Sequence, residues 1–379
     1  MKIKYWFVLM IMMGACTDKY VVNTNTPASG YLVVEGFINM SGTTVIAVTR
    51  SSGLDTPLRV PEPGAQIEIQ SQFGGSFPLV DAGDGQYSAE NLFLDPSQQY
   101  RLHIRTSNGR EYQSEFTSAV VTPPIDDVGW TGGSGLVTIN VSTHDPQTQP
   151  GYYQWQFEET WKYHSAYASD LKYENGQIVP RSVDELIYYC YHSALSNQIA
   201  IASTEKLSSN VVYQFPIQQV SYSSSSKLLI RYSILVKQYA LTKDWYEWIR
   251  KIKKNTESTG SIFDAQPGET GGNIKCVSDP AENVIGFIGC ATETEKRLFI
   301  DRSEIPAGVV YTGYENCAED SIKNNPYDLD NYFKDQFNLP IVFVYPPGAL
   351  APTHVMGASA GCVDCRMTGG TTIPPPFWQ

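Results

Sequence analysis

The chain has 379 residues, enough for two or three domains with sizeable hydrophobic cores. Its 24 tyrosines, 12% aromatic residues and only 17% charged residues are typical of an all-β protein outside the cytoplasm. The formal net charge is −12, and the only basic cluster is RKIKK at 250–254. This composition excludes a typical nucleic-acid-binding protein, which needs grouped Lys and Arg against phosphates.

Residues 1–15 have the pattern of a bacterial lipoprotein signal peptide. Lys2 and Lys4 precede an apolar segment, residues 5–13, that is too short to cross a bilayer as a mature helix. Small residues then lead directly to Cys16. We expect cleavage before Cys16 and attachment of lipid, including palmitate, so that the protein is anchored to a membrane without spanning it. An ordinary secretory signal followed by a chance cysteine is the alternative.

The lipidated Cys16 and a polar segment through residue 30 form the expected flexible tether. Residues 31–121 then contain about seven short segments of alternating hydrophobicity, separated by turns such as DAGDG at 81–85 and SNGR at 107–110. This spacing predicts an N-terminal β-sandwich of immunoglobulin-like or transthyretin-like type.

The two prolines of TPPIDDVGW, at 122–130, mark an expected domain junction, and we assign 122–379 to a second, larger β-sandwich-type domain with insertions. Aromatic and polar residues alternate over 152–165, which predicts a long strand, and the polar segment 166–186 is interpreted as an inserted loop. One amphipathic helix is predicted at 242–258, with Thr242 as its N-cap. The proline-rich end, IPPPFW, should lie extended over the surface.

Six cysteines remain after Cys16. An even number in an oxidising compartment predicts three disulfides, although the sequence cannot choose among 15 connectivities. Cys362 and Cys365 form a C-x-x-C that we interpret as structural; they either pair with each other or tie the tail to Cys190 and Cys317. Cys276 and Cys290 flank a predicted hairpin, which makes a local bridge between them plausible.

The motifs that suggest catalysis lack the rest of an active site. Gly357 to Gly361 spell G-x-S-x-G around Ser359, but no histidine follows residue 354 and we expect no strand–turn–helix there. The five histidines lack the spacing of metal ligands. Asp81 and Asp84 are better interpreted as a hairpin turn, while Asp328 and Asp330 could contribute to a Ca²⁺ site. Glu158 and Glu159 should point to opposite faces of a strand. We predict no enzyme activity, metal or cofactor.

Several stretches in order resemble the Bacteroidota outer-membrane lipoproteins grouped as domain of unknown function 4249. They are Cys16, YLVVEGFI (31–38), the Gly-Gln-Tyr strand after DAGDG, NGREYQSE (108–115), TPPIDDVGW (122–130), YYQWQFEETW (152–161), ILVKQYALTKDWYEW (234–248), GSIFDAQPGETGGNIKC (260–276), VIGFIG (284–289), KRLFIDR (296–302) and CVDCRMTGGTTIPPPFW (362–378). The resemblance implies no assigned activity and a disulfide-held C-terminal cap. It also implies a TonB-dependent outer-membrane transporter as partner.

Two functions therefore follow as expectations. The first is a non-enzymatic accessory subunit of a TonB-dependent, SusC-like barrel, lipid-anchored at the cell surface and helping to capture or gate a nutrient that the sequence does not identify. The second is a stand-alone glycan- or peptide-binding or adhesion lipoprotein that uses exposed aromatics. The candidate aromatic residues alternate along one predicted strand: Tyr152, Tyr153, Trp155, Trp161 and Tyr163. Packing of these side chains between the sheet and the inserted segment is a simpler explanation for them than ligand binding.

Overall fold

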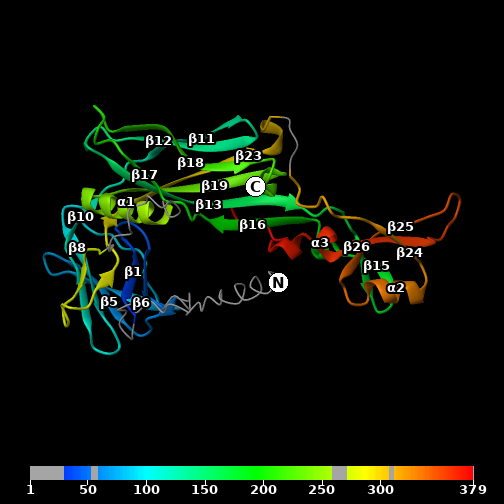
Figure 1. Ribbon diagram of the computed structural model, residues 1–379, viewed down its shortest axis with the longest axis horizontal. Helices are drawn as coiled ribbons and strands as arrows, with labels where there is room; N and C mark the ends of the chain where they lie inside the picture. The colour runs from blue at the N-terminus through cyan, green and yellow to red at the C-terminus, as the bar shows by residue number, and fades with distance from the viewer. Residues whose placement is uncertain (1–29, 53–58, 258–270, 307–310, 379) are drawn as a thin grey trace, which may run out of the picture.

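The computed structural model describes residues 30–52, 59–257, 271–306 and 311–378. The predicted signal peptide, Cys16 and the tether lie outside these ranges. The described chain is mainly β, as the sequence predicts, and it has three parts: an N-terminal domain, a central sandwich and an end lobe that projects from the sandwich (Figure 1). None of the helices in the described ranges has the length and hydropathy of a transmembrane span.

The N-terminal domain is a sheet that curls around one core. Its hydrogen-bonded order is β2-β22-β10-β8-β5-β6-β7-β3-β1-β21, with β4, β9 and β20 pairing off this path. Alternate residues face inward, as in β8, where Tyr100, Leu102 and Ile104 are buried. The strands are β1 (Leu32–Gly36), β2 (Ile38–Asn39), β3 (Thr44–Arg50), β4 (Val60–Pro61), β5 (Gln66–Ser71), β6 (Ser76–Gly83), β7 (Gln86–Ala89), β8 (Gln99–Arg105), β9 (Glu111–Ser114), β10 (Thr117–Val120), β20 (Ile274–Cys276), β21 (Val284–Ile285) and β22 (Cys290–Ala291).

Three of these strands come from a distant part of the sequence, which corrects the expected assignment of all of 122–379 to the second domain. β21 pairs in parallel with β1, β22 pairs in parallel with β2 and β10, and β20 pairs with β9. Buried Ile274, Val284 and Ile288 belong to the same core as the N-terminal strands. These strands are only two or three residues long, so their own hydrophobic patterns are too short to predict where they pair.

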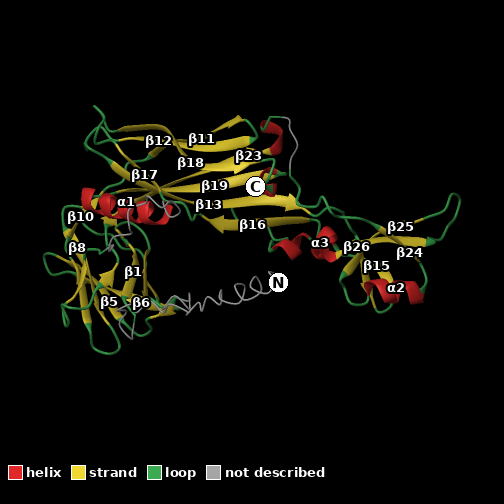
Figure 2. Cartoon of the chain, in the orientation of Figure 1, coloured by secondary structure: helices red, strands yellow, loops and turns green. Residues whose placement is uncertain are grey.

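The central sandwich packs two sheets face to face (Figure 2). One sheet has the order β11-β12-β18, and the other has the order β16-β13-β19-β23, with β17 pairing off the path to β13. Trp155 of β13 and Tyr232 of β19 lie completely buried in the core. The elements are β11 (Ile125–Gly133), β12 (Leu136–His144), β13 (Tyr152–His164), β16 (Tyr189–Leu195), β17 (Ala200–Ser203), β18 (Val211–Ser221), η2 (Ser226–Leu228), β19 (Arg231–Ala240), β23 (Glu293–Asp301) and η3 (Arg302–Glu304).

The predicted helix is confirmed as α1 (Lys243–Glu257), which lies where the first two parts meet (Figure 1). Thr242 is its N-cap, because its Oγ1 accepts a hydrogen bond from the Trp245 backbone N–H at 3.3 Å. Trp245 packs against Phe37 of the N-terminal domain, with ring centroids 5.9 Å apart, and Phe37 also meets Tyr239 of the sandwich at 4.8 Å. This aromatic cluster joins the two parts.

The end lobe combines two stretches far apart in the sequence. The segment expected to be an inserted loop forms a hairpin, β14 and β15, and packs beside the three-stranded sheet β24-β26-β25. Ser169 Oγ donates a hydrogen bond to the carbonyl of Pro340 at 2.6 Å and ties the two stretches together. The elements are β14 (Leu171–Glu174), β15 (Gln177–Pro180), η1 (Val183–Glu185), β24 (Asp320–Lys323), α2 (Pro326–Phe333), β25 (Asn338–Val344), β26 (His354–Ser359), α3 (Ala360–Val363) and η4 (Cys365–Thr368).

Candidate functional site

Two disulfides hold the C-terminal segment, which decides between the alternatives that the C-x-x-C left open. Cys365 pairs with Cys190 of β16, and Cys362 pairs with Cys317, with Cα–Cα distances of 5.7 and 5.8 Å. The two cysteines of the motif therefore do not pair with each other. Each instead connects the end of the chain to a different preceding segment.

The expected third bridge is not formed. Cys276 and Cys290 are buried, unpaired thiols in the core of the N-terminal domain. Their strands do not form a hairpin, because β20 pairs with β9 while β22 lies between β2 and β10. Burial raises the pKa of the Cys290 thiol to about 12, so this group stays protonated and unreactive at neutral pH.

Ser359 lies in more regular structure than the sequence indicated. It ends β26 and directly precedes α3, so a strand does lead into a short helix there. Its φ of −55° is unstrained, and its hydroxyl donates to the disulfide sulfur Sγ of Cys362 at 3.2 Å. A nucleophile elbow places serine on a strained turn beside a histidine base. Neither feature is present at this hydroxyl, so the motif is structural.

The carboxylates singled out in the sequence serve local structure. Asp81 accepts a hydrogen bond from the Gly83 N–H at 2.8 Å in a hairpin turn, and Asp84 has a φ of 51°. Asp328 lies in the capped first turn of α2, and Asp330 accepts a hydrogen bond from the Tyr173 hydroxyl at 2.9 Å. The described ranges contain no group of three or more His, Cys, Asp or Glu that could hold a metal ion.

Glu159 of β13 is buried, as are most of the aromatic residues considered for ligand binding. Its carboxylate accepts hydrogen bonds from the Tyr232 hydroxyl at 2.7 Å and from Lys227 Nζ at 2.6 Å. The neighbouring Glu158 has the opposite side-chain direction and is only half-buried.

The aromatic residues of β13 do not form a binding surface, because Trp161 is half-buried and the others are buried: Tyr152, Tyr153, Trp155 and Tyr163.

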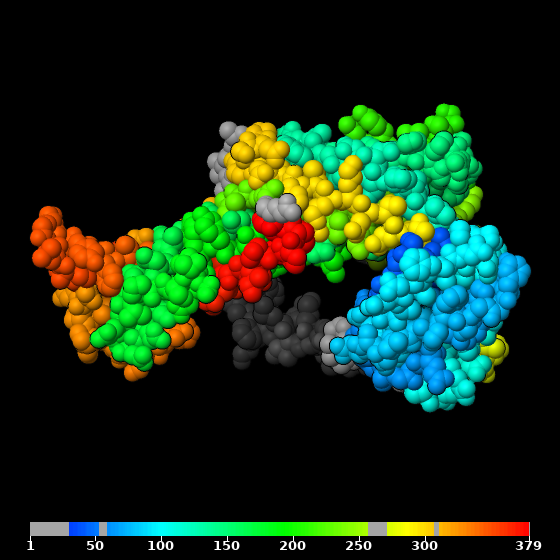
Figure 3. All heavy atoms as spheres, turned by 180° about the vertical axis from the view of Figure 1, so that it is seen from behind, coloured from blue at the N-terminus to red at the C-terminus, as the bar shows by residue number. Residues whose placement is uncertain are grey.

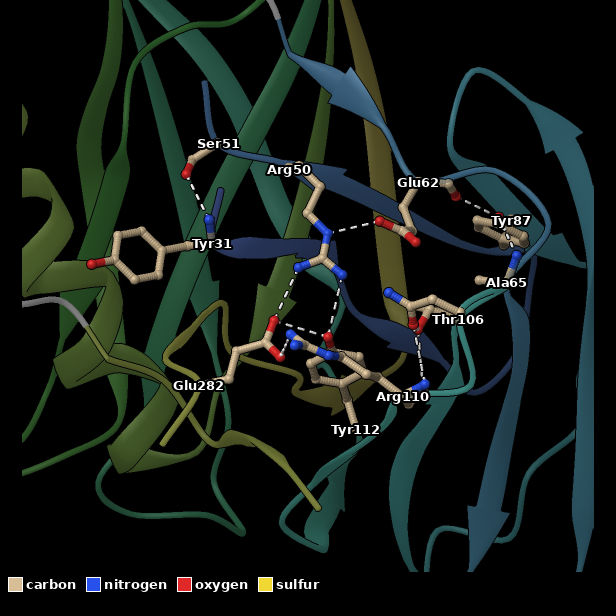
Figure 4. A network of polar contacts seen from close by, with 11 residues as sticks. Tyr31, Arg50, Ser51, Glu62, Ala65, Tyr87, Thr106, Arg110, Tyr112 and Glu282 are labelled. Atoms are coloured by element: carbon tan, nitrogen blue, oxygen red, sulfur yellow. Dashed lines mark hydrogen bonds and ion pairs between the residues drawn. The ribbon is translucent and has the colours of Figure 1, made fainter. Parts of the chain in front are cut away.

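A buried charge network holds the returning segment 277–285 against the N-terminal domain (Figure 4). Arg50, at the end of β3, donates to Glu62 at 2.7 Å, to Glu282 at 2.9 Å and to the Tyr112 hydroxyl at 3.2 Å. The Tyr112 hydroxyl in turn donates to Glu282 at 2.9 Å, and Arg110 pairs with the same carboxylate. Every charge in the network is compensated, so it is a structural clamp and not an open site.

The pKa directions agree with this role. Burial by itself would raise the pKa of Glu282, but hydrogen bonds from Tyr112 and Arg50 and the charges of Arg110 and Arg50 together lower it. Burial likewise opposes the charged form of Arg50, and its carboxylate and phenol partners outweigh burial and raise its pKa. The folded protein therefore favours the charged forms of both Glu282 and Arg50.

A cavity of about 790 Å³ lies beside the disulfide-held end of the chain. One side is formed by Tyr189, the first residue of β16, and the preceding Tyr188, with ring centroids 4.6 Å apart in an edge-to-face arrangement. Tyr189 is 50% exposed, and Tyr188 stacks on His164 at 5.0 Å. The complete lining is Ala168, Ser169, Asp170, Val183, Asp184, Leu186, Tyr188, Tyr189, Thr372, Ile373 and Pro374.

The opposite side of this cavity is the proline-rich end of the chain, which lies on the sandwich surface as the sequence predicts (Figure 3). Thr371 and Tyr191 exchange two backbone hydrogen bonds, of 2.7 and 2.9 Å. The disulfide from Cys190 to Cys365 lies next to them, and the Trp378 ring packs edge-on against Tyr191 at 5.2 Å. The fold therefore holds residues 372–374 in place, and the cavity is pre-formed.

A second cavity, of about 320 Å³, is lined by β14 and by the C-terminal segment around Arg366. Its two acidic side chains are paired with basic side chains of the same lining: Glu174 with Lys172 at 3.3 Å, and Asp364 with Arg366 at 2.7 Å. In the larger cavity, by contrast, the carboxylates of Asp170 and Asp184 have no hydrogen-bonding or ion-pairing partner among the described residues. The larger cavity is therefore the better candidate for a ligand.

The sequence analysis did not identify the residues of this cavity. The only local signal was the polar composition of residues 166–186 next to the aromatic YYCY at 188–191. These residues meet residues 372–374 beside the Cys190–Cys365 disulfide, whose two cysteines are 175 residues apart in the chain.

Among known protein families, residues 17–297 match the model described as Domain of unknown function (DUF4249). The chain belongs to this family. The matched DUF4249 segment ends within β23, so the second stretch of the end lobe and the C-terminal wall of the large cavity lie beyond it. No curated protein matches the sequence.

Two solved structures illustrate how distant the structural similarities of this DUF4249 protein are. One is a putative carbohydrate binding protein from Bacteroides uniformis, with 9% identity, covering 56% of this chain and 90% of that one at a TM-score of 0.14. Another is a DUF3823 family protein from Bacteroides ovatus, with 10% identity, covering 56% of this chain and 91% of that one at a TM-score of 0.16. Similarity at this level carries no functional argument.

Proposed function

We propose that the protein is a lipid-anchored outer-membrane lipoprotein that acts as a non-enzymatic accessory subunit of a TonB-dependent, SusC-like barrel, helping to capture or gate its substrate. Attachment through Cys16 and a surface-facing orientation are part of this proposal. The observation that supports it best is the end lobe, which projects from the sandwich (Figure 3). This lobe also exposes large apolar side chains.

The apolar surface of the end lobe lies on one edge strand and the loops beside it. β25 pairs only with β26 among the described strands, and Val342 and Val344 on it are exposed. Tyr345 and the fully exposed Leu350 follow in the next loop, and Phe337 precedes the strand. A surface strand flanked by exposed apolar side chains can contact another polypeptide, which makes it a suitable docking element.

Affinity purification of the lipidated protein from native outer membrane in mild detergent tests the proposal. We expect a stoichiometric TonB-dependent barrel, identified by mass spectrometry. A Leu350→Asp variant should lose the barrel if the end lobe is the docking element. The matched control is Phe93→Asp, which changes a similarly exposed apolar residue in the N-terminal domain and should retain the barrel.

Recovery of the lipoprotein alone, with the wild-type chain folded and lipidated, would contradict the transporter partnership. Stand-alone glycan or peptide binding would then be the better function. The buried aromatic row of β13 no longer supports that function, but the large cavity beside Tyr189 does.

A further inference from the structure

The large cavity combines two unpaired carboxylates with aromatic and aliphatic walls. Asp170 and Asp184 are both exposed at its surface, and no Lys, Arg or His is among the described residues that line it. Val183, Leu186 and Ile373 provide the aliphatic walls. Two carboxylates without an ion-pair partner create a local negative potential that favours a positively charged ligand and disfavours an anionic one.

The tyrosine rings add a second preference for cations, because the face of an aromatic ring is electron-rich. The chain itself demonstrates this at Tyr189, where Lys162 Nζ lies 4.7 Å from the ring centroid. Lys162 reaches the ring from the neighbouring strand β13 and is not among the cavity-lining residues. Its ammonium offsets part of the negative charge but leaves the two carboxylates unpaired.

We propose that this cavity binds a cationic group on an aliphatic stem, an alkylammonium or guanidinium whose stem packs against the aliphatic walls and whose head pairs with Asp170 and Asp184. The volume of about 790 Å³ is within the range of small-molecule sites and accommodates one or two such side chains. The cation comes from a free amine or guanidine, or from Lys or Arg in an extended peptide.

The site is ready to bind without rearrangement. Its C-terminal wall is fixed by the Cys190–Cys365 disulfide and the backbone hydrogen bonds between Thr371 and Tyr191. A pre-formed wall removes much of the entropy cost of ordering the site, a cost that would otherwise oppose binding. The inference depends on the cavity and not on the transporter partnership, so the two can fail separately.

Isothermal titration calorimetry on the detergent-solubilised full chain tests this inference. The probes are acetyl-Gly-Arg-Arg-Gly-amide, its citrulline counterpart, which has nearly the same shape without the charge, free agmatine, and maltotetraose. We expect the arginine peptide to bind at least about tenfold more tightly than the citrulline peptide and to weaken with added salt. Agmatine binding as tight as that of the peptide assigns a small free cation, and tighter peptide binding assigns a polypeptide ligand.

Two variants test the residues. The double substitution Asp170→Asn and Asp184→Asn should weaken binding of the arginine peptide by about tenfold or more, and Tyr189→Leu should weaken it by several-fold. Asp335→Asn, at an exposed position elsewhere in the end lobe, should change nothing. All four substituted positions are exposed, and circular dichroism checks that the variants fold.

Equal binding of the citrulline peptide, unchanged affinity in the double variant, binding of maltotetraose alone, or no response to either cation at millimolar concentration would each overturn the inference.

Discussion

Trp155 donates its indole N–H to Oε1 of Gln238 at 2.8 Å, and both side chains are completely buried in the central sandwich. The amide nitrogen of Gln238 continues the chain of hydrogen bonds to the carbonyl of Pro123 at 2.9 Å and to Thr143 Oγ1 at 3.0 Å. Gln238 thus provides a hydrogen-bond partner for the Trp155 indole in the core, for the Pro123 carbonyl at the domain junction and for the Thr143 hydroxyl on the facing sheet.

Gln238→Leu should therefore destabilise the protein by about 2 to 4 kcal/mol, because it leaves the buried indole N–H without a partner and the Pro123 carbonyl with only the Thr294 hydroxyl at 3.1 Å. Chemical denaturation monitored by tryptophan fluorescence measures this change. Gln156→Leu is the matched control, since Gln156 is exposed on the same sheet, and its effect should stay within about 0.5 kcal/mol. Equal stabilities for the two variants would contradict the assigned role of Gln238.

Replacing Cys190 and Cys365 with Ser should destabilise the protein by about 3 to 5 kcal/mol. The bridge closes a loop of 175 residues, and a cross-link between distant positions restricts the unfolded chain most. The same change at Cys317 and Cys362, which are 45 residues apart, should have a slightly smaller effect. Thermal unfolding without reductant measures both, and an unchanged melting temperature in the first variant would show that the bridge contributes nothing.

The Glu282 clamp predicts a pH dependence. The folded-state pKa of Glu282 is below its ordinary value, so its contribution is fully present above about pH 5 and is lost as the pH falls through the folded pKa. Glu282→Gln removes the charge while keeping most of the shape, and it should lower the free energy of unfolding at pH 7 by about 2 to 4 kcal/mol. Denaturation curves at pH 7 and pH 3 should therefore differ less for the variant than for the wild type.

Gly289 is needed where the N-terminal domain meets α1. A Cβ at this position would lie 2.1 Å from the Trp245 ring, and the indole is buried and cannot move aside. Gly289→Ala should destabilise the protein by about 1 to 3 kcal/mol. Gly133→Ala, where no atom lies within 4 Å of the added carbon, is the control and should leave the melting temperature almost unchanged.

Local patterns in the sequence predicted the elements whose folding depends on neighbours along the chain. Helix α1 was predictable because Thr242 can cap it and its apolar residues recur at helical spacing. The long strand β13 was predictable from alternation, and the hairpin turn at Asp81 from its glycines. The hairpin β14–β15 was missed, because its short polar strands resemble a loop until they pack beside β25.

The sequence by itself determined the all-β class and the surface position of the C-terminal end, since these depend on composition and short patterns. Tertiary structure alone decided which cysteines pair, that β20, β21 and β22 return to the first sheet, and that Asp170 and Asp184 share a cavity with residues 372–374. These outcomes join residues that are far apart in the chain. Each contact depends on how two segments that are distant in sequence pack against each other, and no local sequence pattern encodes that packing.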